Sequence, residues 1–213
     1  VLGIKQDEAW ILCALAETAR YVGELELAQR SGEASRTLFQ TLGAKSGLAV
    51  VLHHLAMVSL FSRDPAVAQQ LFAESLQVSQ AINRKQMIAR CLAGFGGVAA
   101  HLSDAPRALR LLSAANSLFT VLPPFLTPAD QVDYEQFKQL ARTQLIISDY
   151  MDAWQAGAAM SVEEAVAYAQ AKSLSLSHKI GVTTLPAAQV ATLKALGAVE
   201  EIYTLVDSHF VVY

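Results

Sequence analysis

Small and apolar residues recur at a fixed offset of 40 positions, and this repeat constrains the fold more than any other feature of the sequence. In-register matches at such a spacing are typical of repeat proteins. Each unit is too small to bury its own apolar face, so its stability comes from stacking on the next unit. The matching positions are Ala9, Ala49 and Ala89; Leu12, Leu52 and Leu92; Ala16, Ala56 and Gly96; Glu24, Asp64 and Asp104; and Ala28, Ala68 and Ala108.

Each unit carries the pattern of two amphipathic helices joined by a turn. Asp64 is expected to cap the second helix of its unit, with Pro65 at the first helical position, where its missing N–H leaves no hydrogen bond unmade. Ser103, Asp104 and Pro106 repeat this start in the third unit. The predicted helices of the first two units cover residues 6–21, 24–42, 48–61 and 64–82.

The repeat ends at residues 122–125, where a pair of prolines cannot continue a helix. Further helices are predicted beyond this break. Thr127 and Pro128 indicate a helix that extends to about Ile147, and a short helix follows over 149–156. Ser161 and Glu164 form a capping box, which predicts the start of a last helix containing Ala165, Val166 and Tyr168.

The C-terminal stretch has a mixed pattern. Residues 186–196 have helical periodicity, whereas 202–205 and 210–213 are apolar runs rich in β-branched and aromatic residues. We therefore divide the chain into three repeats at 1–121, a closing helical segment at 122–175 and a C-terminal tail at 176–213.

The composition excludes several classes of protein. Of the 213 residues, 53% are hydrophobic and 16% charged, which allows a large core and excludes disorder as the main state. The net charge of -3 argues against a surface adapted to nucleic acid. The apolar runs fall short of the roughly 18 to 20 residues that span a bilayer. Only two cysteines favour a reduced, cytoplasmic setting, and the missing initial Met indicates a part of a longer chain.

The order of residues within each unit resembles the tetratricopeptide repeat. Leu12, Ala16, Glu24 and Ala28 follow its sequence of a Leu, a small residue, an acidic residue after the turn and an Ala in the second helix. The unit is longer than the usual one of about 34 residues. It resembles the C-terminal repeats of large bacterial signal-transduction ATPases and of LuxR- and AfsR-like transcriptional regulators. The resemblance implies an all-α solenoid of three helical hairpins of about 40 residues, with extra C-terminal helices.

The segment after the repeats is similar to the closing segment of that family. Residues 91–99 and 108–115 precede the proline break, and Tyr134 with Phe137, Ala153–Trp154 and residues 159–166 then follow in the family's order. The resemblance implies a non-enzymatic sensor or interaction module of a bacterial multidomain regulator. The helix-turn-helix that often follows is not expected, because few Lys and Arg come after Lys179.

No catalytic constellation is visible in the sequence. His53 and His54 are adjacent, so on a helix they point about 100° apart and do not form a metal pair; we expect one towards the groove and one packed. Residues 94–97 are rich in glycine but lack the Lys and Ser or Thr of a phosphate loop, so close helix packing explains them better. We therefore expect no enzymatic activity, no cofactor and no metal.

The concave groove is the candidate functional site. In tetratricopeptide arrays it is lined by fixed positions of the first helix of each unit, and here these give a mixed wall suited to a protein, an extended peptide, a helix or a small effector. The alternatives are a groove filled by the chain's own closing helices, or a solvated surface. A different function, homo-oligomerisation through the apolar tail at 210–213, also remains open. The groove residues are Trp10, Cys13, Glu17, Arg20, Val50, His53, Met57, Leu60, Arg90, Ala93, Gly97 and Ala100.

Overall fold

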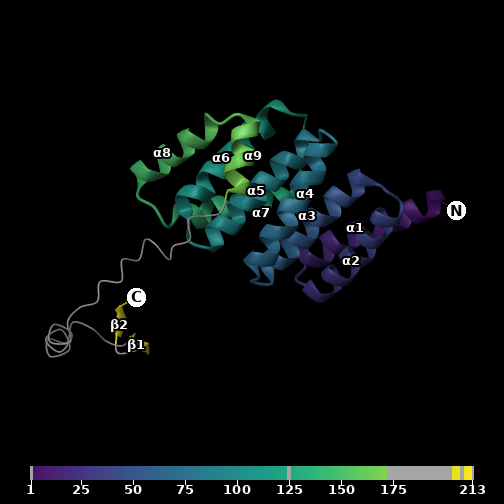
Figure 1. Cartoon of the computed structure of the whole chain (residues 1–213), viewed down its shortest axis with the longest axis horizontal. Coiled ribbons are helices and arrows are strands. Elements are labelled where there is room, and N and C mark those ends of the chain that lie inside the picture. The colour runs from purple at the N-terminus through teal and green to yellow at the C-terminus, as the bar shows by residue number, and fades with distance from the viewer. Residues whose placement is uncertain (1, 124–125, 172–202, 207–208, 213) are drawn as a thin grey trace, which may run out of the picture. The chain divides into compact units, whose positions relative to one another are not determined.

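The computed structural model describes residues 2–123, 126–171, 203–206 and 209–212, which fall into two compact units, 1–171 and 172–213. Nine helices make up the described part of the first unit (Figure 1). They are α1 (Leu2–Tyr21), α2 (Leu25–Thr41), α3 (Lys45–Phe61), α4 (Pro65–Ala81), α5 (Lys85–His101), α6 (Ala105–Val121), α7 (Pro128–Arg142), α8 (Ile147–Ala158) and α9 (Val162–Gln170).

The described part of the second unit is a two-stranded antiparallel sheet. It consists of β1 (Tyr203–Val206) and β2 (His209–Val212), with Tyr203 opposite Val212. These strands overlap the two apolar runs noted in the sequence at 202–205 and 210–213. The predicted helix at 186–196 lies outside the described residues, as do Pro124 and Phe125 of the proline break.

The first six helices form three hairpins that repeat every 40 residues, as the sequence predicts. The second helices begin at Leu25, Pro65 and Ala105. The turns repeat as well, because the backbone has a positive φ at equivalent positions in successive units. Such a φ favours glycine, yet Arg63 and Ser103 adopt it where the first unit has Gly23. The left-handed residues of the turns are Gly23, Arg63 and Ser103 within hairpins and Gly43 and Asn83 between them.

The predicted caps at Asp64, Thr127 and Ser161 are confirmed. The helices expected to begin at about residues 6 and 48 begin earlier, at Leu2 and Lys45, and one predicted helix end is wrong. The Asp64 carboxylate accepts a hydrogen bond from the backbone N–H of Val67, 3.0 Å away. Capping boxes begin α7 and α9. The helix expected to reach Ile147 ends at Arg142, because a short turn lets α8 return along α6. Gln144 stabilises this turn by donating a hydrogen bond to the carbonyl oxygen of Ala100, 3.1 Å away.

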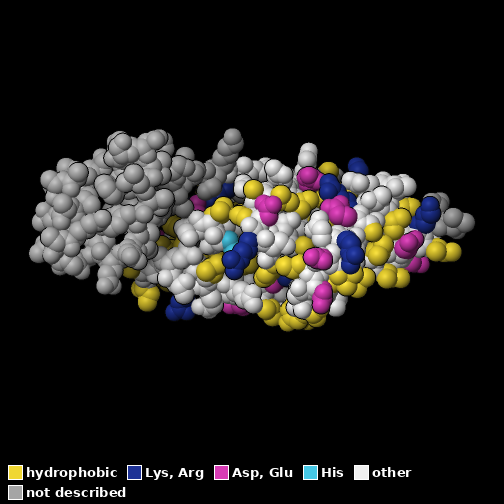
Figure 2. Space-filling model, turned by 90° about the horizontal axis from the view of Figure 1, so that it is seen from below, with side chains coloured by type: hydrophobic (Ala, Val, Ile, Leu, Met, Phe, Trp, Pro, Cys, Tyr) yellow, Lys and Arg dark blue, Asp and Glu magenta, His cyan; other side chains and the backbone are white. Residues whose placement is uncertain are grey.

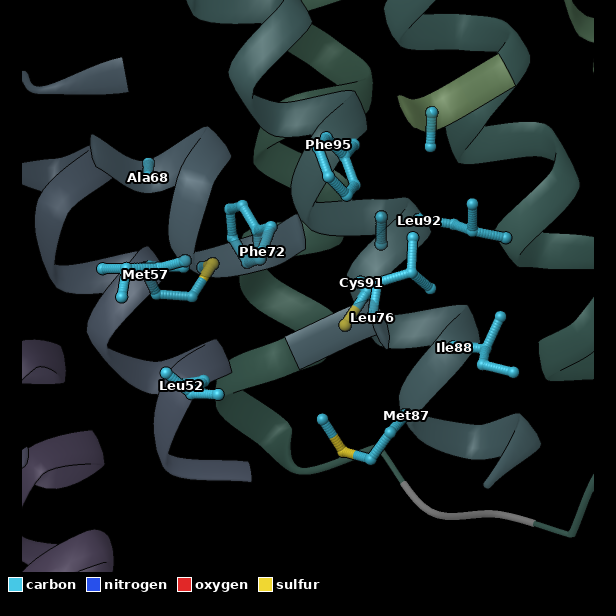
Figure 3. Packing of buried hydrophobic residues seen from close by; sticks show 14 of the residues in the cluster. Leu52, Met57, Ala68, Phe72, Leu76, Met87, Ile88, Cys91, Leu92 and Phe95 are labelled. Carbon is cyan, nitrogen blue, oxygen red and sulfur yellow. The ribbon is translucent and has the colours of Figure 1, made fainter. Parts of the chain in front are cut away.

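Small side chains let the helices approach closely. A Cβ atom at Gly96 would lie 2.8 Å from Leu112 and 3.2 Å from the carbonyl oxygen of Ala108, so α6 packs directly on the backbone of α5. Between hairpins, Phe72 of α4 and Phe95 of α5 fill the core, with ring centroids 5.9 Å apart (Figure 3). The recurring small residues of the sequence are thus packing positions, as expected.

The C-terminal side of the array is covered by α8 and α9. A Cβ atom at Gly157 of α8 would lie 2.2 Å from the carbonyl oxygen of Arg110, so the two backbones touch. Ser113 of α6 donates a hydrogen bond to the carbonyl oxygen of Trp154, 2.7 Å away. Arg107 donates to carbonyl oxygens at the end of α9, including that of Tyr168 at 2.8 Å. The last hairpin therefore has its outer side covered.

No helix among the described residues combines the length and the apolar character needed to cross a bilayer.

Candidate functional site

The predicted groove residues form the inner face of the array, and helix α7 lies over it. We use "inner face" for the groove residues of α1, α3 and α5 named above. Trp10 remains 38% exposed and Glu17 is half-buried, while the others are buried. The structure therefore places a closing helix of the same chain against the predicted wall, the first of the alternatives that the sequence left open. The buried groove residues are Cys13, Arg20, Val50, His53, Met57, Leu60, Arg90, Ala93, Gly97 and Ala100.

Two buried ion pairs join the inner face to α7. Arg20 of α1 contacts Asp133 through both oxygens, at 2.7 and 3.3 Å, and the two side chains are only 4% and 7% exposed. Arg90 of α5 contacts Asp130 at 2.8 Å. Asp130 also accepts the N–H of Thr127, 3.0 Å away, so one carboxylate both caps α7 and holds it to α5. A bidentate arginine pair fixes orientation as well as distance.

Two neutral histidines lie beside these pairs. The Nε2 atom of His53 is 3.9 Å from Asp130, and that of His54 is 4.0 Å from Glu17. Burial, with Arg90 as the next cause, lowers the pKa of both imidazoles well below the ordinary value of 6.5. Both are therefore uncharged at neutral pH, and these contacts are polar contacts rather than ion pairs. The expectation that one histidine faces the groove fits His53, which faces α7.

The polar cluster is incompletely satisfied. Burial raises the pKa of the Asp133 carboxyl above its ordinary value, although the neighbouring Arg20 acts in the opposite direction. The Nε atoms of Arg20 and Arg90 and the Nδ1 atom of His53 are buried and have no hydrogen-bond partner among the described residues. Buried polar groups without partners destabilise a fold, so this cluster is not optimised for stability alone.

Aromatic side chains complete the contact of α7. Phe137 packs on Gly97, where a Cβ atom would lie 2.6 Å from its ring, and the hydroxyl of Tyr134 donates to the carbonyl oxygen of Leu112, 3.2 Å away. Together with Asp130 and Asp133, these residues stand at i, i+3, i+4 and i+7 on one helix face. This is the spacing by which an amphipathic helix binds a groove.

The sequence analysis identified Tyr134 and Phe137 only as a family-like pair, and it missed Asp130 and Asp133. Their spacing on one helix face was the signal that could have found them. Glu17 was predicted as a groove residue, but its partner was missed: it accepts a hydrogen bond from the hydroxyl of Thr127 at 3.0 Å and so ties α1 to the start of α7.

Little space remains beside α7. A cavity of about 20 Å³ lies between the inner face and α7, lined among others by His53, Met57, Arg90, Asp130 and Phe137. Pockets for drug-sized ligands usually hold about 300 to 1,000 Å³. The cavity is far below that range, so with α7 in place the geometry favours a helix over a small-molecule ligand as the occupant of this face.

Two kinds of reactive group, metal-ligating side chains and thiols, bear on the chemistry of the site. Within the described residues, no three His, Cys, Asp or Glu side chains gather where they could hold a metal ion. Cys13 and Cys91 are free and buried, and burial raises the pKa of each thiol to about 12. Thiols with such a pKa are weak nucleophiles at neutral pH.

No family model, no curated protein and no solved structure matches this chain.

Proposed function

We propose that the helical unit is a non-enzymatic interaction module with tetratricopeptide-like hairpins, belonging to a bacterial multidomain regulator. The 40-residue repeat of the hairpins and the small residues at their contacts support the likeness to that repeat. The inner face would sense a protein or peptide partner, and the event would pass to other domains of the parent chain.

The observation that carries this proposal is the way in which α7 occupies the inner face. Its face of Asp130, Asp133, Tyr134 and Phe137 reaches three successive hairpins, at Arg20, His53 and Arg90, as a bound helix would. Breaking one buried ion pair by removing a partner typically destabilises a contact by about 3 to 5 kcal/mol, whereas the intact pair adds little net stability. Such pairs favour one specific occupant.

The partner that fits this face is an amphipathic helix with the same arrangement. Two carboxylates three positions apart would meet Arg90 and Arg20, and two aromatic side chains would fill the space of Tyr134 and Phe137. In the resting protein α7 supplies this helix, and a partner helix of the same chemistry displaces it. Both arginines are paired with carboxylates before and after the exchange, so neither end state has a buried charge without a partner.

A peptide-binding experiment tests this exchange. A fluorescent peptide covering residues 127–142 is titrated into the wild-type chain and into an Asp133→Asn variant, with fluorescence anisotropy as the readout. In the variant, Arg20 is buried beside a neutral amide. The variant's α7 therefore competes less well with the added peptide for the inner face. We expect the peptide to bind the variant on the order of tenfold more tightly than the wild type, in which the tethered helix has a high effective concentration.

The matched control is the same peptide carrying Asp133→Asn, which cannot restore the ion pair with Arg20 and is expected to lose the preference for the variant. Circular dichroism establishes that the variant chain keeps its helices. A folded variant that binds neither peptide would show that α7 is a permanent part of the core, and the proposal would be abandoned.

A second candidate function is homo-oligomerisation through the tail. Among the described residues, β1 and β2 pair only with each other, and an isolated two-stranded sheet is marginal in water. Strand addition by a second copy would stabilise it. Light scattering of the whole chain and of a chain ending at Ala171 tests this: a dimer that becomes a monomer on truncation supports it, and a monomer in both cases contradicts it.

A further inference from the structure

The outer face of α1 exposes apolar residues whose counterparts in the next two hairpins are buried. Ile11 is 68% exposed and Leu15 is 40% exposed. The residues 40 positions further on are at most 4% exposed. Figure 2 shows hydrophobic side chains at the surface towards the N-terminal end of the helical unit. The buried counterparts are Val51 and Leu55 on α3 and Cys91 and Phe95 on α5.

In the two later hairpins, the second helix of the preceding hairpin covers this face. Leu55 of α3 lies against Gly32 of α2, where a Cβ atom would come within 2.6 Å of it. Phe95 of α5 packs on Phe72 of α4, which also lies over Gly94. On α3 and α5, this face is therefore the surface on which the second helix of the preceding hairpin packs.

We infer that the outer face of α1 is a docking surface for the second helix of a further hairpin of the same repeat, which covers it as α2 covers α3. Leu15 repeats Leu55, so an occupant that docks as α2 docks on α3 carries a glycine or another very small residue at the position of Gly32. The contact centres on Ile11 and Leu15, and the polar Glu8 and Thr18 flank it at the edge. This inference rests on the stacking of the hairpins and is independent of the proposed function of the inner face.

A second copy of the chain does not offer the required helix. In the array, the helices that cover a following unit are α2 and α4, and their equivalent in the last hairpin is α6. The outer side of α6 is already covered by α8 and α9, through Ser113 with Trp154 and through Arg107 with Tyr168. The occupant is therefore a further hairpin rather than a copy stacked head to tail.

A chain extended by one hairpin tests the inference. A copy of residues 5–44 is placed directly before Lys5, which keeps the natural junction because Lys45 follows Ala44 in the sequence. Ile11→Cys in the original hairpin provides a thiol for labelling, and cysteine is the natural residue at the equivalent position 91. Cys13 and Cys91 are buried, so their thiols are not expected to react with the labelling reagent.

We expect the thiol at position 11 to react with a disulfide reagent freely in the unextended chain and at least about tenfold more slowly in the extended one. Glu26→Cys is the matched control, because its counterparts Ala66 and Pro106 are both exposed and its labelling should not change. In a second extended chain, Gly32→Leu in the added copy blocks the close approach and should restore fast labelling.

Three results would overturn the inference. The first is an added hairpin that gains no helical circular dichroism, or that leaves the thiol at position 11 as reactive as before. The second is equal protection with Gly32→Leu in the added copy, since the helix would then not dock as α2 docks on α3. The third is protection already present in the unextended chain together with a dimer in light scattering, which would identify a second copy as the occupant.

Discussion

Acidification from pH 7.5 to 5.5 is expected to destabilise the helical unit through His53 and His54. Both imidazoles have a pKa well below the ordinary value of 6.5 in the folded protein, because they are buried beside Arg90 and Arg20. The unfolded chain binds protons at these histidines as the pH falls through 6.5, and the folded chain does not. The free energy of unfolding is therefore highest above pH 6.5 and falls as the pH drops below this value.

The magnitude follows from the protons that the unfolded chain gains. At pH 5.5, one pH unit below the ordinary pKa, protonation lowers the free energy of the unfolded chain by about 1 kcal/mol per histidine, and at pH 7.5 by almost nothing. The two histidines together reduce the free energy of unfolding by at most about 3 kcal/mol, the limit in which both stay neutral in the folded chain at pH 5.5. Asp133 acts in the opposite direction, because burial raises its pKa and its folded form takes up a proton above the ordinary carboxyl range.

Urea unfolding of the wild type and of a His53→Asn, His54→Asn double variant separates these effects. The variant keeps Asp133 and the other titratable groups, so only the difference between the two pH dependences belongs to the two histidines. Any general loss of stability in the variant applies at both pH values and cancels from the comparison. If wild type and variant lose the same free energy of unfolding between pH 7.5 and 5.5, the histidines are not held neutral and the reasoning is refuted.

Two further predictions concern close packing. Gly157→Ala places a methyl group against the backbone of Arg110 and should lower the free energy of unfolding by about 1 to 3 kcal/mol, measured in urea; an unchanged value would show that α8 does not touch α6. Ser75→Ala removes the hydrogen bond from its hydroxyl to the carbonyl oxygen of Ala49, 2.7 Å away, and should lower it by about 1 kcal/mol, with exposed Thr37→Ala as the control.

Much of the array could be predicted because its signals are local. The 40-residue register, the caps at Asp64 and Thr127 and the small residues at helix contacts each act within one or two neighbouring helices. The end of α7 could not be predicted from local signals. The apolar pattern continues past Arg142, and the turn there is set by the docking of α8 on α6, a contact between distant segments.

The occupant of the inner face also depends on distant segments. The resemblance to tetratricopeptide arrays predicts Arg20, His53 and Arg90 on one wall, but the partners Asp130 and Asp133 lie beyond the proline break, and nothing local relates them to that wall. Whether the groove is open or covered by α7 changes the role of Arg20 and Arg90. On an open groove they would be solvated and available to a ligand, whereas beneath α7 each is committed to a carboxylate.

Helix α7 is held to the array by different contacts from those that hold α8 and α9. Helices α8 and α9 cover α6 through backbone contact at Gly157 and hydrogen bonds to main-chain carbonyl oxygens, which depend on shape and have no charged partner to exchange. Helix α7 is held by two buried ion pairs, by Phe137 and by a hydrogen bond from the Tyr134 hydroxyl to the carbonyl oxygen of Leu112 in α6. Under the proposed function, a helix with the same four side chains would replace these contacts one for one, while α8 and α9 would stay in place on α6.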